Sequence, residues 1–161
     1  MSRFADNVDV RYAKAPQAAL NSGATDNLTE VNGVAVDLQG LTGIRYRRVR
    51  VAFPYSTTLD TGRTLTLASN LQHRETATGA GSTWVDFGTA PSNHTVTNAT
   101  TTDNVVTESA FEYEQDLTTV ARFLRVQVTP SFSSTTTGQG LLSYSGAFVL
   151  GDPNKYPADG A

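Results

Sequence analysis

Residues 64–88 constrain the fold of this chain most, because they carry the pattern of two strands joined by a tight bend. Residues 65–71 place leucine or serine at every second position, the period of a strand with one buried face. The bend at residues 78–82 has two glycines, which adopt the positive φ angles of a chain reversal at little cost. The return arm holds the only tryptophan, Trp84. This stretch predicts a two-stranded antiparallel unit.

Shorter runs with strand character recur along the chain, separated by Gly, Pro, Asn, Ser and Thr. They predict strands at residues 29–38, 44–53, 105–106, 111–117, 121–129 and 141–150, in addition to the two arms above. Residues 89–104 are predicted to form a long loop apart from these strands. No segment has the pattern of a helix of normal length. The spacing predicts an all-β fold, an antiparallel β-sandwich or jelly roll of about eight strands with an extended N-terminal arm.

The apolar faces of these strands predict the core. We expect Val34, Val36 and Leu38 to share an inward face. We also expect one large aromatic residue to anchor the space between the sheets. The residues expected to pack together there are Trp84, Leu67, Val51, Val126 and Phe148.

The length of 161 residues fits one domain. Residues 1–28 lack a sustained apolar period, and their aromatic anchors are Phe4 and Tyr12. One interpretation is a frayed terminus. The other is an extended arm that lies along a neighbouring chain, with one of these rings in an apolar groove. Residues 29–153 are expected to form the β-sandwich domain, and residues 154–161 a flexible tail.

Several kinds of chemistry find no support in the residues. The chain has no cysteine and a net charge of −3, so neither thiolate chemistry nor a strongly basic nucleic-acid surface is expected. His73 and His94 have no second ligand at metal spacing, and no spacing selects a catalytic triad. No apolar run reaches the roughly 20 residues of a membrane helix. We expect no enzyme, cofactor, metal, membrane or small-molecule substrate.

Arginines are concentrated in two of the predicted strands. Arg48 and Arg50 share one face of the strand at residues 44–53, and Arg125 lies in the strand at residues 121–129. One interpretation is a solvated sheet face on which the arginines pair with Glu112, Glu114 and Asp116. The other is a contact with an acidic surface of another protein subunit. The predicted contact residues are Phe4, Tyr12, Arg48, Arg50 and Arg125.

Three motifs together resemble a known group of proteins. They are Gly81-Ser82-Thr83-Trp84-Val85-Asp86-Phe87-Gly88, Ala121-Arg122-Phe123-Leu124-Arg125-Val126-Gln127-Val128, and the ending Ala147-Phe148-Val149-Leu150-Gly151-Asp152-Pro153. Over residues 29–153 the chain is similar to the capsid decoration (cement) proteins of tailed bacteriophages, a family of small β-sandwich virion proteins.

The resemblance implies a non-enzymatic structural protein, often a homotrimer, that binds the outer capsid surface and stabilises the shell. Its partner would be the major capsid protein, and its location the virion surface after synthesis in the host cytoplasm. The alternative is a glycan-binding or structural β domain of a phage tail or fibre. In that case Trp84, Tyr113 or Tyr144 would serve as stacking platforms.

Overall fold

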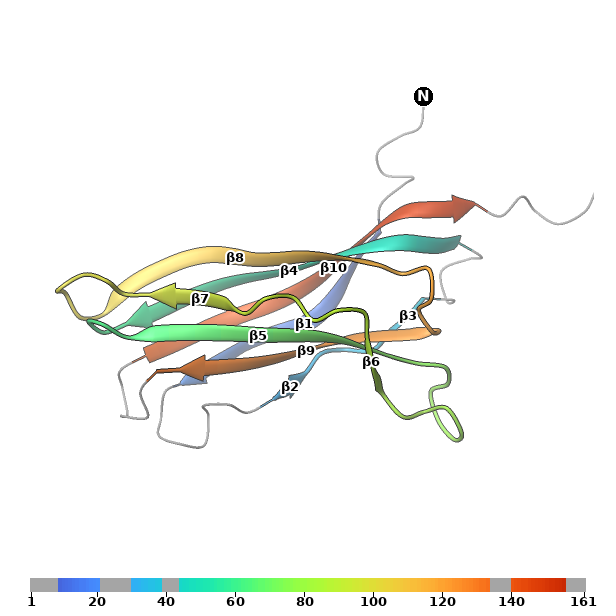
Figure 1. Ribbon diagram of the computed structural model, residues 1–161, viewed down its shortest axis with the longest axis horizontal. Coiled ribbons are helices and arrows are strands. Elements are labelled where there is room, and N and C mark those ends of the chain that lie inside the picture. The colour runs from blue at the N-terminus through green and yellow to red at the C-terminus, as the bar shows by residue number, and fades with distance from the viewer. Residues whose placement is uncertain (1–8, 21–29, 39–43, 134–139, 156–161) are drawn as a thin grey trace, which may run out of the picture.

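A computed structural model describes residues 9–20, 30–38, 44–133 and 140–155, which form ten strands in two packed antiparallel sheets (Figure 1). Sheet A has the order β1-β10-β4-β8. Its strands are β1 (Asp9–Leu20), β4 (Ile44–Leu59), β8 (Val105–Asp116) and β10 (Gly140–Lys155). Sheet B is built from β2 (Val31–Asn32), β3 (Val36–Asp37), β5 (Thr64–Arg74), β6 (Val85–Phe87), β7 (His94–Thr97) and β9 (Phe123–Phe132).

The strand order is that of a jelly roll. β2 and β3 both pair with β9, and β6 and β7 both pair with β5, so each couple acts as one interrupted strand. Counted in this way, the chain has eight strands. In chain order, sheet A then has the order 1-8-3-6 and sheet B the order 2-7-4-5. This is the strand order of the eight-stranded jelly roll. The predicted all-β sandwich of about eight strands is confirmed.

The core lies between the sheets and follows the predicted alternation. β5 alternates buried and half-buried residues from Thr64 to Leu71, and β9 buries Leu124, Val126 and Val128. A fully buried aliphatic or aromatic side chain contributes roughly 1.5–3 kcal/mol. The largest fully buried side chains are Phe53, Phe148, Leu59, Leu65, Leu67, Leu71, Leu124, Leu142, Leu150, Val49, Val51 and Val126.

Two predicted core residues lie elsewhere. Trp84 is half-buried and does not belong to the core cluster, whereas its four expected neighbours do. Val34 is 51% exposed, although Val36 and Leu38 are buried as predicted. The reason is local: Gly33 still donates to the Val126 carbonyl oxygen of β9 (2.6 Å), but the Val34 N–H donates to the Ala13 carbonyl oxygen in the other sheet (2.9 Å).

The expected N-terminal arm is wrong over residues 9–20. These residues form β1, which pairs with β10 from Asp9 opposite Leu150 to Leu20 opposite Leu141. Ala13 is fully buried. The register shifts twice along this pairing, and such bulges break the alternation by which a strand is recognised in a sequence. Residues 1–8 and 21–29, including Phe4, lie outside the described residues.

Several element boundaries also differ from the prediction: the strands predicted at residues 105–106 and 111–117 are one strand, β8, and β9 runs from Phe123 to Phe132. β4 continues through Pro54 to Leu59, because the ladder with β10 skips Phe53 and Pro54, so the missing proline N–H breaks no pair there. The predicted loop at residues 89–104 contains β7. β10 extends past Gly151 to Lys155, and residues 156–161 of the predicted tail lie outside the described residues.

Candidate functional site

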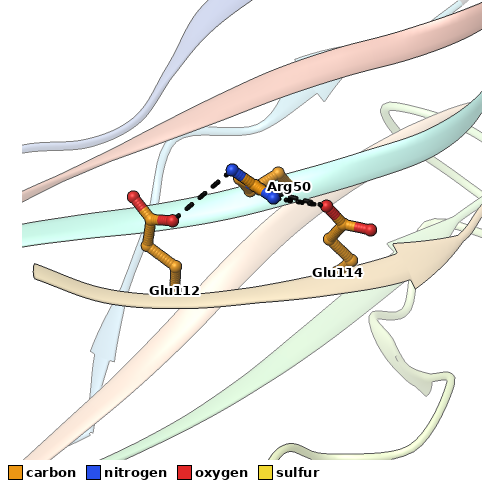
Figure 2. A network of polar contacts seen from close by, with 3 residues as sticks. All are labelled: Arg50, Glu112 and Glu114. Carbon is orange, nitrogen blue, oxygen red and sulfur yellow. Dashed lines mark hydrogen bonds and ion pairs between the residues drawn. The ribbon is translucent and has the colours of Figure 1, made fainter.

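The outer face of sheet A brings together the arginines of β4 and the acidic residues of β8. Arg50 stands opposite Glu114 in the register, and Arg48 stands opposite Asp116. Figure 2 shows the Arg50 guanidinium between two carboxylates of the neighbouring strand. Its Nη2 lies 2.8 Å from Glu114 Oε1, and its Nη1 lies 3.7 Å from Glu112 Oε2.

The contacts of Arg50 and Arg48 within the chain differ. Arg50 pairs with Glu112 and Glu114, as the interpretation of a solvated, charge-paired sheet face predicts. The Arg48 side chain is exposed and forms no hydrogen bond or ion pair within the described ranges. Hydrogen bonds from Thr118 are the main reason that the pKa of Asp116 is lowered, and the charges of Arg48 and Arg47 add to it. The surface is mixed in charge rather than basic.

Exposed aliphatic side chains lie on the same face. Leu141 stands opposite Thr58 of β4, which stands opposite Val106 of β8, so these residues form a row across three strands. Leu141 is 46% exposed and Val106 is 60% exposed. Val10 of β1 stands opposite Val149 of β10 and is 62% exposed. We call the exposed Val10, Val106 and Leu141, together with Arg48 and Arg50, the sheet A surface.

The other predicted contact residues do not join this surface. The side chain of Arg125 points away from the core on sheet B, the opposite side of the sandwich. Tyr12 lies in β1, and only its backbone, paired with Ala147, is described. Phe4 lies outside the described residues. The structure therefore brings Arg48 and Arg50 together and separates Arg125 from them.

Arg125 belongs to an arginine and aromatic cluster on sheet B. The guanidinium carbons of Arg74 and Arg125 each lie over the Trp84 ring, 4.4 Å from its centroid. Arg125 also donates from Nε and Nη2 to Gln72 Oε1 (3.0 and 2.6 Å), and Gln72 Nε2 donates to Asp86 Oδ1 (2.9 Å). Burial lowers the pKa of Arg125.

Each of the three proposed stacking platforms already has contacts within the chain. Two guanidinium groups already lie over Trp84. Tyr144 is 3% exposed and belongs to the core. Tyr113 packs against the core, and its hydroxyl lies 2.9 Å from Ser69 Oγ. Trp84 is thus neither a core anchor nor a free stacking platform. It packs against the guanidinium groups of two arginines on the outside of the sheet, which the sequence did not indicate.

Both histidines are held by packing contacts. The Tyr55 hydroxyl lies 2.9 Å from His94 Nε2, and the His94 ring stacks on Phe111 with centroids 5.2 Å apart. The backbone N–H of Ala121 donates to His73 Nδ1 (3.1 Å). Among the residues that the structure describes, no group of three or more His, Cys, Asp or Glu side chains is placed to hold a metal ion.

A polar cleft of about 310 Å³ opens on the outer face of sheet B. Its floor is formed by β5 and β9, and its walls by Glu30 on one side and by Asp86 and residues 90–93 on the other. The cleft exists because β6 pairs with residues 71–73 of β5 and β7 with residues 64–67. Residues 68–70 of β5 consequently have no paired strand on that side. No sequence pattern marks this gap, because the composition of residues 89–104 predicts a single loop.

Comparison with known proteins finds low-scoring similarities among solved structures and no match in sequence. No family model and no curated protein matches the chain. The chain is similar to a chain of the infectious bursal disease virus particle (TM-score 0.49, 9% identity) and to one of the VP2 subviral particle of that virus (TM-score 0.46, 11% identity). Each alignment covers 89% of this chain and 31% of the other, so the chain spans about a third of their length.

A further similarity is to the coat protein of tobacco streak virus, with a TM-score of 0.31 and 12% identity, covering 96% of this chain and 92% of that chain. All three TM-scores lie below 0.5. In the described segments, no helix has the length and apolar character to cross a membrane.

Proposed function

We propose that this chain is a non-enzymatic virion protein that binds the outer surface of a capsid and stabilises the shell. The observation that carries the proposal is the sheet A surface on a jelly roll, a fold that viral capsid domains use widely. Three of the exposed large hydrophobic residues, Val10, Val106 and Leu141, lie on this one face. Val106 and Leu141 flank Thr58, whereas Val10 lies in the row of Val149 and Arg50, eight residues away along β4. The proposed contact would therefore extend along the face rather than form one patch.

The charges on this face fit a contact role better than a stabilising one. Surface ion pairs such as Arg50 with Glu114 contribute about 0–1 kcal/mol to folding, so their removal leaves the fold intact. Paired charges around apolar residues set the orientation of a partner and exclude wrong partners. Arg48, which has no ion pair within the described ranges, is the residue most available to a carboxylate of the shell.

The resemblance of residues 29–153 to phage decoration proteins supports the same function and adds a homotrimeric state. The three subunits of one trimer would present three linked contacts, which converts modest single contacts into strong attachment. The partner is the major capsid protein, and the location is the virion surface. Arg125 is not part of the proposed contact, because it lies on the opposite face and is held by Gln72 and Trp84.

Binding to shells tests this function. Undecorated shells of the same virus are incubated with the protein, and the copies bound are counted after sedimentation. We expect Arg48→Glu and Val106→Glu to reduce occupancy about tenfold or more, because the three linked contacts of a trimer weaken together. Thr97→Glu, at an exposed position of β7 in sheet B, is the matched control and keeps full occupancy.

Two outcomes contradict different parts of the proposal. If the unmodified protein does not sediment with shells, capsid binding is wrong. If it binds and Arg48→Glu and Val106→Glu bind equally well, the sheet A surface is not the contact.

A further inference from the structure

The cleft on sheet B retains unused hydrogen-bonding groups. The side-chain amides of Asn70 and Asn93 line it and have no hydrogen-bond partner in the described part of the chain. They offer two N–H donors and one carbonyl acceptor each. Such groups on an otherwise hydrogen-bonded surface can take up a polar ligand without breaking existing bonds.

The two carboxylates of the cleft are held in place by glutamine amides. Gln127 Nε2 donates to Glu30 Oε1 (2.6 Å) and to Asn32 Oδ1 (2.9 Å). On the facing wall, Gln72 Nε2 donates to Asp86 Oδ1. Each carboxylate therefore has one oxygen engaged and, within the described ranges, one oxygen left to accept. A fixed side chain loses less conformational entropy when a ligand binds.

The held carboxylate of Asp86 also connects to the arginine and aromatic cluster. Arg125 donates twice to Gln72, and Arg125 itself lies over the Trp84 ring. The contacts therefore run from Trp84 through Arg125 and Gln72 to Asp86, and they fix the orientation of one wall of the cleft. Second-layer support of this kind is what a precise binding site requires.

We propose that this cleft binds a neutral saccharide unit. The ligand must offer both donors and acceptors, because carboxylates and amides face it together, and hydroxyl groups offer both. Two carboxylates at the walls repel phosphate and sulfate groups. Pro91 and Ala68 supply apolar contacts for the C–H groups of a sugar ring. A volume of about 310 Å³ is at the lower end of small-ligand sites, which suits one sugar unit.

This inference does not depend on the proposed capsid function. A virion that carries many copies would bind a glycan surface strongly through weak single sites. If this protein is not part of a virion, the same cleft would still bind saccharides. Shell binding and saccharide binding involve opposite faces of the sandwich, so either can fail without the other.

Nuclear magnetic resonance titration tests the site. The ¹⁵N-labelled protein is titrated with the methyl glycosides of glucose, galactose, mannose and N-acetylglucosamine. With at least one of them we expect amide shifts confined to residues at the cleft. Asp86→Asn and Asn93→Ala should weaken that binding about tenfold, the effect of losing one hydrogen bond to a charged or polar site group. Glu108→Gln, an exposed carboxylate on β8, is the control and should bind as the unmodified protein does.

The same spectra show whether each variant is folded, and a variant whose spectrum collapses is replaced by Asn70→Ala. The proposal is overturned if no glycoside shifts the cleft amides at tens of millimolar. It is also overturned if calcium chloride or sodium phosphate alone shifts them and no glycoside does. Unchanged binding in both cleft variants contradicts it equally.

Discussion

Replacing Tyr144 by phenylalanine should stabilise this fold, whereas the same replacement at Tyr113 should destabilise it. Both phenol rings lie in or against the core. The Tyr144 hydroxyl is buried and has no hydrogen-bond partner in the described part of the chain. The Tyr113 hydroxyl bonds to Ser69 Oγ at 2.9 Å. Both substitutions remove a hydroxyl oxygen, which has no hydrogen-bond partner among the described residues at Tyr144 and has one at Tyr113.

The magnitudes follow from these contacts. A buried polar group without a partner costs about 1–3 kcal/mol, so Tyr144→Phe should raise the free energy of unfolding by about 1 kcal/mol. Tyr113→Phe loses one hydrogen bond, but Ser69 keeps its bond to the Gln127 carbonyl oxygen (3.2 Å), so the loss should be about 1 kcal/mol. For a chain of this length, 1 kcal/mol shifts the melting temperature by about 2–4 °C.

Alkaline pH gives a second measurement on the same variants. Burial raises the pKa of both Tyr113 and Tyr144 to about 12. In the unfolded chain these hydroxyl groups lose their protons at about pH 10, whereas in the folded chain they keep them to about pH 12. The free energy of unfolding is therefore unaffected by these groups below about pH 10 and falls as the pH rises towards about 12. Each phenylalanine variant should lose less stability than the parent over this range.

Calorimetric melts at neutral pH and urea titrations at several alkaline pH values measure both effects. Equal destabilisation by Tyr144→Phe and Tyr113→Phe would refute the reasoning, because it would mean that the Tyr144 hydroxyl has a partner after all.

Three other predictions concern the fold and the assembly. Deleting residues 1–20 should lower the melting temperature strongly or prevent folding, since β1 and the fully buried Ala13 complete sheet A; an unchanged melt would contradict this. Gly33→Ala should destabilise by about 2 kcal/mol or more, because its Cβ would overlap the Ala13 carbonyl oxygen. Gly151→Ala, where a Cβ meets nothing within 4 Å, is the control, and equal melts for the two variants would contradict the close contact. The protein should be a homotrimer by light scattering at micromolar concentration, and a monomer at that concentration would contradict the proposed oligomer.

The parts of the fold that were predictable are those in which a single strand carries its own burial pattern. β5 alternates from Thr64 to Leu71, the second half of β8 alternates throughout, and β9 alternates apart from the buried Gln127. Leu67, Val126 and Phe111 could therefore be placed on an inward face from the sequence. β1 could not be found in this way, because backbone pairing with β10 holds it and two register shifts interrupt its period. Trp84 was misplaced because its size suggested a core anchor, while its actual contacts are arginines from two other positions.

The candidate sites also divide into features that a local sequence pattern predicts and features that depend on distant strands. Alternation alone put Arg48 and Arg50 on one outward face, and the acidic face of β8 was equally visible. Their registry, which pairs Arg50 with Glu114, depends on which strands are neighbours. The cleft on sheet B depends on a break between β6 and β7 and on Glu30 from a distant segment, so no local sequence pattern marks it.

The location of the protein on the particle is the most direct test of the account. Electron cryomicroscopy of virions with and without this protein yields a difference map of the shell. We predict regular density on the outer capsid surface, with the sheet A surface, including Arg48 and Val106, against the shell. Density confined to the tail, or particles that lack the protein altogether, would contradict the proposed function.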